Sequence, residues 1–368
     1  MIKSVIKNTV SKETWDKFRE KKRQFHNLLI KSTLNPELKN DKKIVIIGVA
    51  DYNNLGDHAI AEAQNQFVSK IIDSSLEIKN KYKIVEIPTK TPVRHIMSIL
   101  NSEDIILFTG GGNLGTKYDF LDDTFMPIID KYPNNKKLFF PQSYTFNESG
   151  DSEKRLTEIK NKFAKSGKNL TITARESKSL ELFKTTFPAN NVIYCPDIVL
   201  SLNTFSEPKT VPEYDVLMLM RDSGEKVLDF DTQNELINTL KQSFTVKVKE
   251  NDEVGFVKHT DRMPELNKAW AEVQNSNLVI TDRLHGMIFA HILEKPCIVF
   301  DNYNSKIKMT YQDWLKDMDT IAFIDPRGEV NPSDISKVIS KLMIKSVKPF
   351  DTDKKYKPLE NQLKSIIK

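Results

Sequence analysis

The sequence predicts an α/β protein made of two doubly wound domains that face each other across a cleft. From Lys42 onward, short apolar runs alternate with amphipathic stretches, and the run Lys43–Ala50 (KIVIIGVA) is rich in Ile and Val. Such runs are typical of parallel strands that are buried on both faces of a sheet. The proline-containing segment Ser206–Glu213 (SEPKTVPE) separates a first β–α series from a second. With 368 residues, the chain is long enough to bury two cores.

The two series supply the strands of the two predicted sheets. In the first series, strands are expected at Lys43–Ala50, Tyr82–Pro88, Asp104–Thr109, Lys137–Pro141, Leu170–Ala174 and Val192–Cys195. In the second, they are expected at Asp215–Met220, Phe244–Lys249, Leu278–Thr281, Cys297–Phe300 and Thr320–Ile324. We therefore divide the chain into a basic helical segment 1–40, a first domain 41–208, a second domain 209–330 and C-terminal helices 331–368. The last of these helices could cross back to the first domain.

The composition is that of a globular protein. Hydrophobic residues make up 39% of the chain and charged residues 29%. The two cysteines, Cys195 and Cys297, cannot form a disulfide framework and lack the spacing of a metal site. The sequence shows neither a signal peptide nor a run of about 18 apolar residues. We therefore expect a cytoplasmic protein with no metal or other cofactor.

Positive charge is concentrated in the N-terminal segment. The formal net charge is +5, and residues 1–32 contain nine Lys or Arg against three acidic residues. This segment could lie on the anionic inner face of the membrane, or it could be a solvated helix that packs on its own domain. Because the excess is confined to one segment rather than spread as a basic stripe, we expect no nucleic-acid partner.

Polar loops follow the predicted strands, at the sheet edges where doubly wound folds bind ligands. The loop Asp51–His58 (DYNNLGDH) follows the first strand. Gly56 permits a tight turn there, and Asn54 or Asp57 opens a helix whose N-terminus favours an anion. Asp57 could cap this helix or contact a substrate hydroxyl. We predict that Asn54, Gly56 and Asp57 belong to a substrate site.

A glycine-rich run, Thr109–Gly115 (TGGGNLG), follows the third strand. Its spacing matches a dinucleotide fingerprint, but it does not follow the first strand of the chain, and the next strand does not end in an acidic residue for a ribose. Adjacent glycines indicate that the backbone closely approaches a ligand or a neighbouring strand. The candidate substrate-binding residues here are Gly110, Gly111, Gly112 and Asn113.

Two arginines occupy equivalent positions at strand ends in the two halves of the chain. Arg175 follows the strand 170–174, and Arg221 follows the strand 215–220. The planar guanidinium group binds carboxylate and phosphate in a bidentate manner, so both are candidate substrate ligands. Arg175 could instead form a salt bridge with Glu176 or Asp197.

The segment Asn277–Met287 (NLVITDRLHGM) is the strongest indication of a functional site. It places Asp282, Arg283, His285 and Gly286 between a buried strand and an apolar helix expected at Met287–Leu293. Charged residues at such a position are costly unless they are paired or take part in function. We therefore predict a functional role for His285, whereas His291 lies on another face of the helix and is expected to pack in the interior.

The motif Thr281–Gly286 (TDRLHG) resembles one of the polysaccharide pyruvyltransferase family. Other segments look like further landmarks of that family and occur in the same order, namely NLGD (54–57), GGGN (110–113), ARE (174–176), CPD (195–197), RDSGE (221–225) and PCIVFDN (296–302). The similarity covers about residues 43–325 and is greatest to bacterial exopolysaccharide pyruvyltransferases. It implies two Rossmann-like domains in a glycosyltransferase type B-like arrangement. It also implies phosphoenolpyruvate as the donor and a hexose of a glycan, or of its lipid-linked repeat unit, as the acceptor.

The resemblance also implies roles for individual residues. His285 is the candidate acid, and Arg283 and Arg175 are expected to hold the donor anion, with Arg221 as a further ligand. Asp282 or Asp57 could orient the imidazole or accept a hydroxyl proton, and the helix starts after Gly56 and Gly286 could add N–H donors.

Two alternative functions remain open at this point. A nucleotide-sugar-dependent glycosyltransferase can have the same fold, and it would bind UDP or GDP. A non-catalytic glycan-assembly or stress-response protein could retain the fold without turnover.

Overall fold

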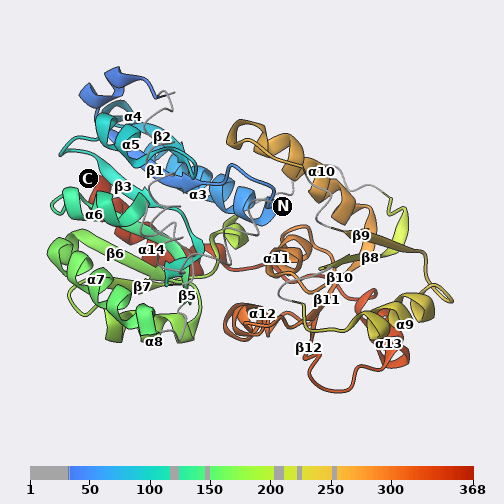
Figure 1. The fold of residues 1–368 in the computed structure, drawn as a ribbon. Helices are drawn as coiled ribbons and strands as arrows, with labels where there is room; N and C mark the ends of the chain where they lie inside the picture. The colour runs from blue at the N-terminus through green and yellow to red at the C-terminus, as the bar shows by residue number, and fades with distance from the viewer. Residues whose placement is uncertain are drawn as a thin grey trace, which may run out of the picture.

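The computed structural model describes residues 32, 34–116, 124–145, 150–202, 211–221, 226–250 and 255–368 (Figure 1). These residues form two parallel sheets, each covered by helices on both faces. The predicted basic segment lies outside the described residues, apart from its last part, where Pro36–Asn40 forms a 3₁₀ helix. Most of the proline-containing linker also lies outside them. No helix in the described part of the chain is both long and apolar enough to cross a membrane.

The first sheet has the strand order β2-β1-β3-β5-β6-β7, and β4 pairs with β5. All of these pairs are parallel. The strands are β1 (Lys43–Val49), β2 (Lys83–Pro88), β3 (Ile105–Phe108), β4 (Gly111–Gly115), β5 (Lys137–Thr145), β6 (Leu170–Ala174) and β7 (Asn191–Tyr194). The helices are α3 (Leu55–Asp73), α4 (Leu76–Lys81), α5 (Val93–Ile99), α6 (Met126–Lys131), α7 (Gly150–Ser166) and α8 (Ser177–Thr186).

The second sheet has the strand order β12-β11-β10-β8-β9, again with parallel pairs only. Its strands are β8 (Tyr214–Met220), β9 (Val246–Glu250), β10 (Ser276–Thr281), β11 (Cys297–Phe300) and β12 (Ile321–Ile324). Its helices are α9 (Phe230–Leu240), α10 (Arg262–Gln274), α11 (Leu284–Ile292), α12 (Lys306–Thr310) and α13 (Pro332–Leu342). The last helix, α14 (Thr352–Ile367), returns to the first domain and packs on α3 and β7 (Figure 1). The two Rossmann-like sheets face each other, as the sequence predicted, in the glycosyltransferase type B-like arrangement that the family resemblance implied.

Each predicted strand is present, and two details differ from the prediction. The strand expected at 137–141 continues as β5 to Thr145. A register shift between Phe139 and Gln142 allows it to pass Pro141, which cannot donate a ladder hydrogen bond. The glycine-rich run, expected to be a loop, forms the additional strand β4.

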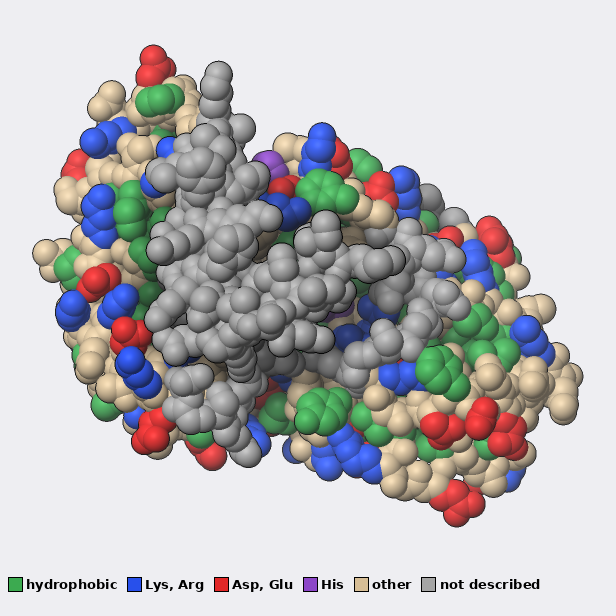
Figure 2. All heavy atoms as spheres, viewed as in Figure 1, with side chains coloured by type: hydrophobic (Ala, Val, Ile, Leu, Met, Phe, Trp, Pro, Cys, Tyr) green, Lys and Arg blue, Asp and Glu red, His purple; other side chains and the backbone are tan. Residues whose placement is uncertain are grey.

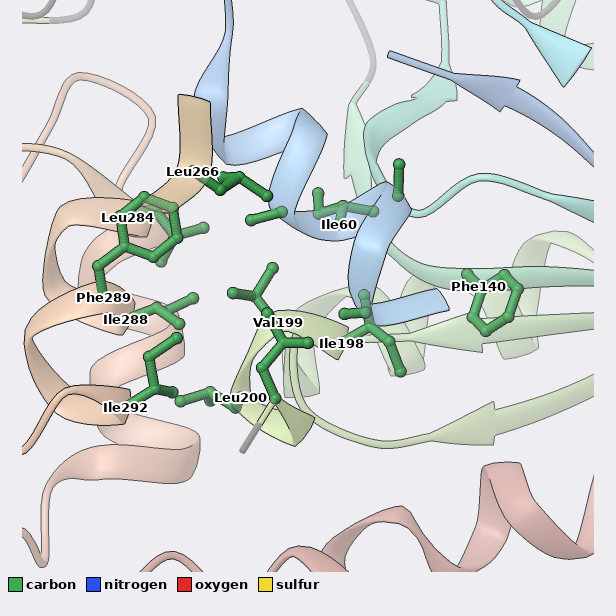
Figure 3. Packing of buried hydrophobic residues seen from close by; sticks show 14 of the residues in the cluster. Ile60, Phe140, Ile198, Val199, Leu200, Leu266, Leu284, Ile288, Phe289 and Ile292 are labelled. Carbon is green, nitrogen blue, oxygen red and sulfur yellow. The ribbon is translucent and has the colours of Figure 1, made fainter. Parts of the chain in front are cut away.

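An apolar interface joins the two domains. The short helix η4 (Ile198–Ser201) of the first domain packs against α11 of the second, and α3 packs against α10. Figure 3 shows Val199 and Leu200 facing Ile288 and Ile292 across this interface. One continuous buried cluster therefore spans both domains and fixes their spacing.

A buried arginine adds an ionic contact at one edge of this interface. Arg262, at the start of α10, donates to Glu62 of α3 at 2.8 Å and to both carboxylate oxygens of Glu86 in β2 at 2.8 and 3.0 Å. Its removal would leave two poorly solvated carboxylates without their counter-charge.

We therefore expect Arg262→Met to lower the free energy of unfolding by about 1–3 kcal/mol in denaturant titrations. The matched control is Lys337→Met, which removes an exposed pair with Asp334 and should cost about 0.5 kcal/mol or less. Equal losses in the two variants would mean that the Arg262 cluster does not stabilise the interface.

Candidate active site

A cavity of about 650 Å³ lies between the two domains at the carboxyl ends of their strands. Six of the predicted site residues line it, namely Asn54, Gly56, Arg221, Arg283, His285 and Gly286. Lys249 and Lys268 also line it, together with Glu265 and Glu272. Figure 2 shows Lys and Arg side chains in the hollow between the two domains. The sequence did not indicate Lys249 or Lys268, because nothing in their local pattern distinguishes them from solvated surface lysines.

The first turn of α11 forms one wall of this cavity. The helix begins at Leu284, earlier than predicted, so His285 and Gly286 lie inside its first turn rather than before it. Thr281 holds this start, since its hydroxyl donates to the Leu219 carbonyl at 2.7 Å and accepts from the Arg283 N–H at 3.1 Å. A Cβ at Gly286 would lie 3.1 Å from Cβ of Thr281 and closer still to its hydroxyl, so glycine is required there. No side chain in the described residues caps α11, and its first N–H groups can therefore bind an anion.

The start of α3 differs from this arrangement. Asn54 is the N-cap residue, and its side-chain oxygen accepts from the N–H groups of Gly56 and Asp57. Asp57 is therefore not the N-cap residue of α3. Its carboxylate accepts from the Tyr52 hydroxyl and from the Asn54 amide, both at 2.8 Å. The N–H groups of Gly56 and Asp57, which the sequence analysis expected to be open to an anion, are thus already hydrogen-bonded. The uncapped start of α11 is therefore the better anion site of the two.

The imidazole of His285 lies between the two domains. Its side chain is 18% exposed, and its Nε2 is 3.6 Å from Oδ2 of Asp197 in the first domain. On the same ring, a Cβ added at Gly56 would lie 2.7 Å from Cγ and closer still to Nδ1. Gly56 therefore supplies the space in which the imidazole lies, and this contact, rather than a tight turn, explains the glycine.

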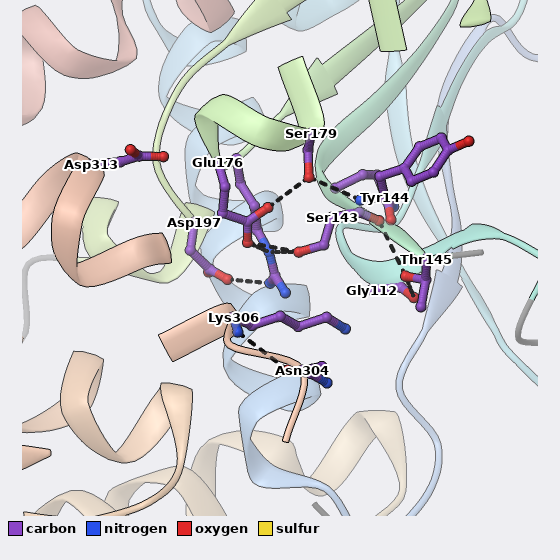
Figure 4. A network of polar contacts seen from close by, with 12 residues as sticks. Gly112, Ser143, Tyr144, Thr145, Glu176, Ser179, Asp197, Asn304, Lys306 and Asp313 are labelled. Carbon is purple, nitrogen blue, oxygen red and sulfur yellow. Dashed lines mark hydrogen bonds and ion pairs between the residues drawn. The ribbon is translucent and has the colours of Figure 1, made fainter. Parts of the chain in front are cut away.

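A buried polar network holds Asp197 (Figure 4). Arg175, 3% exposed, donates to Asp197 at 2.7 Å, to Glu176 at 2.8 Å and to the Ser143 hydroxyl at 2.6 Å. The sequence analysis named a salt bridge from Arg175 to Glu176 or Asp197 as an alternative to substrate binding. The structure shows salt bridges to both. Burial alone would raise the pKa of Asp197, but His285 and Arg175 together hold that pKa well below its usual range. Arg175 does not line the cavity and contacts carboxylates rather than open space.

The two carboxylates that the sequence offered as partners of His285 have other contacts. Asp282 is buried, and its Oδ1 accepts from the backbone N–H of Arg221 at 2.9 Å. Burial raises the pKa of Asp282 above its ordinary value. Asp57 is engaged at the α3 cap, as described above. Asp197, which the sequence offered as a partner of Arg175 and not of His285, is the carboxylate that faces His285.

The glycine-rich run contacts a neighbouring strand. A Cβ at Gly110 would lie 2.9 Å from the carbonyl oxygen of Pro141, and Gly111 has a φ of +114°. The Asn113 N–H donates to the Gln142 side chain at 3.2 Å. Gly112 instead faces Lys306 of the second domain, whose Nζ would be 2.6 Å from an added Cβ (Figure 4). Lys306 brings a cation across the interface, and sequence reasoning missed it because only the folded chain brings it to Gly112.

Two parallel-sheet domains thus enclose a cleft whose described lining includes His285, Arg221 and Arg283. The chain belongs to the polysaccharide pyruvyl transferase family, which matches residues 54–305.

The chain is also similar to individual proteins. The chain is 31% identical to General stress protein 30 of Bacillus subtilis over 90% of its own length and 94% of that protein. It is 28% identical to Pyruvyl transferase 1 of Schizosaccharomyces pombe, over 74% and 70% of the two chains. Among solved structures, a functionally uncharacterized protein of Klebsiella pneumoniae shares the fold. That protein has a TM-score of 0.51 at 18% identity, with 79% of this chain and 99% of that one covered.

Proposed function

We propose that the protein transfers the pyruvyl group of phosphoenolpyruvate to a hexose as a ketal and releases phosphate. The acceptor is a hexose of an exopolysaccharide or cell-surface glycan, or of its lipid-linked repeat unit, and the reaction takes place in the cytoplasm. The observation that carries the proposal is the position of His285 in the interdomain cavity, on the same wall as Arg283 and the open first turn of α11.

The donor needs several anion anchors because phosphoenolpyruvate carries both a carboxylate and a phosphate. Arg221 and Arg283 line the cavity, and the first N–H groups of α11 lie beside them. Guanidinium groups and a helix N-terminus are well suited to these anions. Lys306 adds a cation at the Gly112 side of the interface.

The proposed reaction begins with protonation of the methylene carbon of the donor by His285. An imidazole can give and take a proton near neutral pH. The protonated donor has a cation-like centre at C2, which one sugar hydroxyl attacks while its proton returns to the imidazole. A second hydroxyl of the same sugar then displaces the phosphate, and its proton leaves with that group. The methylene becomes a methyl group, two C–O bonds form, and the bond to phosphate breaks, so no oxidant or reductant is required.

A product assay tests this proposal directly. The protein is incubated with phosphoenolpyruvate and a panel of galactose, glucose and N-acetylmannosamine glycosides, including lipid-linked forms, and the products are analysed by mass spectrometry. We expect a pyruvyl ketal on one acceptor together with an equimolar release of phosphate. Stabilisation by UDP or GDP in thermal-shift assays, without any effect of phosphoenolpyruvate, would instead favour a nucleotide-sugar glycosyltransferase.

A further inference from the structure

We infer that Asp197 is the positioning residue for His285. The proposed acid, in the second domain, is thus oriented by a carboxylate of the first domain. Asp197 belongs to the first domain, where it directly precedes η4, and His285 belongs to α11 of the second. The inference rests on the proposed function for its role in turnover, but the pairing itself can be measured without substrate.

The geometry fixes the ring from two sides. Oδ2 of Asp197 lies 3.6 Å from Nε2 of His285, and Gly56 packs on the ring near Nδ1. Phe289 lies on the same helix, and the centroid of its ring is 6.2 Å from the centroid of the imidazole. A carboxylate at this distance orients an imidazole and favours its charged form.

The charges of the buried network favour the same state of the ring. Arg175 carries one positive charge against the two carboxylates of Glu176 and Asp197, and all three side chains are at most 3% exposed. Glu176 also accepts from the hydroxyl groups of Ser143 and Ser179, which carry no charge. The network therefore has an excess of one negative charge, which a protonated His285 would neutralise.

Two further titratable groups near Asp197, Cys195 and Tyr356, carry no charge. Burial raises the pKa of the Cys195 thiol and of the Tyr356 hydroxyl well above their ordinary values, so both stay neutral. Tyr356, on α14, donates a hydrogen bond to the backbone carbonyl of Asp197. His285 faces Asp197 directly and, when protonated, can balance the charge of the network.

The pair depends on the spacing of the two domains. Asp197 is held by Arg175 and by the Val199 N–H at 3.0 Å, all within the first domain. The second domain contacts this network through Trp314, whose Nε1 donates to the Arg175 carbonyl at 2.6 Å. Any separation of the domains would move His285 away from Asp197 and leave the network with its excess charge.

The test is Asp197→Asn, read first by NMR titration of the protein labelled at its six histidines, with the signal of His285 assigned from the spectrum of His285→Gln. We expect the titration midpoint of the ring to move to lower pH, since an opposite charge within 4 Å is lost. We further expect kcat for pyruvyl transfer to fall at least tenfold, on the order expected when an acid loses its orienting group, with KM for phosphoenolpyruvate changed less than threefold. An unchanged midpoint would overturn the inference.

Two further variants separate charge from folding. Asp197→Glu keeps the charge but moves the oxygen atoms, so it should retain the titration midpoint while kcat falls. A midpoint that moves to lower pH in Asp197→Glu would overturn the inference, and this result does not depend on the folding of the Asn variant. Asp313→Asn is the matched control, because this interface carboxylate accepts from the N–H and hydroxyl of Ser177 and not from the ring. It should leave the midpoint unchanged. If the midpoint shifts in Asp197→Asn but the wild-type protein forms no ketal, the pairing stands and the proposed function fails.

Discussion

Replacement of His285 by alanine is expected to lower the rate of pyruvyl transfer by a factor on the order of 10² to 10⁴, because it removes the proposed proton donor. The fold should persist, since the ring lies at the wall of a cavity and its loss leaves no apolar void in either core. Turnover is measured by phosphate release and by mass spectrometry of the ketal, and folding by thermal denaturation.

The control for this variant is His259→Gln. His259 contacts Asp51 at another part of the interface and does not line the cavity, and its backbone bond to Asp51 does not require the ring. We expect its turnover to remain within about twofold of wild type, as is usual for a partly exposed side chain outside the site. Near-normal turnover in His285→Ala would remove His285 from the mechanism.

Gly56→Ala is expected to cause a loss of activity comparable to that of His285→Ala in a protein that remains folded. The added methyl group would overlap the His285 ring, which must then rotate away from Asp197. Gly56 lies in the first turn of α3 at an ordinary helical φ, so alanine there is compatible with the backbone and should stabilise the helix by about 0.5–1 kcal/mol. We expect at least a 100-fold lower kcat, comparable to loss of the acid itself, with a cooperative thermal transition that shows the protein is folded.

Gly255→Ala provides the matched control, because Gly255 lines the same cavity but has open space where a Cβ would lie. It should retain near-normal turnover. If Gly56→Ala is as active as Gly255→Ala, the contact between Gly56 and the imidazole has no part in catalysis.

The strands and their division into two sheets can be predicted from the sequence, because a buried parallel strand is a short run of apolar residues. β1 is a near-continuous apolar run and β10 contains the apolar run Leu278–Ile280, and both occur where the sequence pattern placed them. The glycine-rich run was harder to interpret, since glycines permit a close approach without indicating to what. In the structure, the approach is mainly to β5, which gives β4.

The site is only partly predictable, because its chemistry depends on contacts between distant segments. Arg283 and His285 share one turn of the chain, so a local pattern reveals them. The pair of Asp197 and His285 joins residues from two domains, and no local spacing encodes it. For the same reason, sequence reasoning offered Asp282 and Asp57, which are closer in the chain to other candidates, as partners of the imidazole.

The return of α14 to the first domain has a consequence for how the protein can be divided. Its buried side chains, Tyr356, Leu359, Leu363 and Ile367, complete the core of a domain that otherwise ends about 150 residues earlier in the chain. Residues 34–202 expressed alone would therefore expose an unfilled apolar groove and lack the hydroxyl that supports Asp197. A first domain that folds alone would need α14 fused after residue 202. The two domains of this chain therefore cannot be separated by a single cut in the sequence.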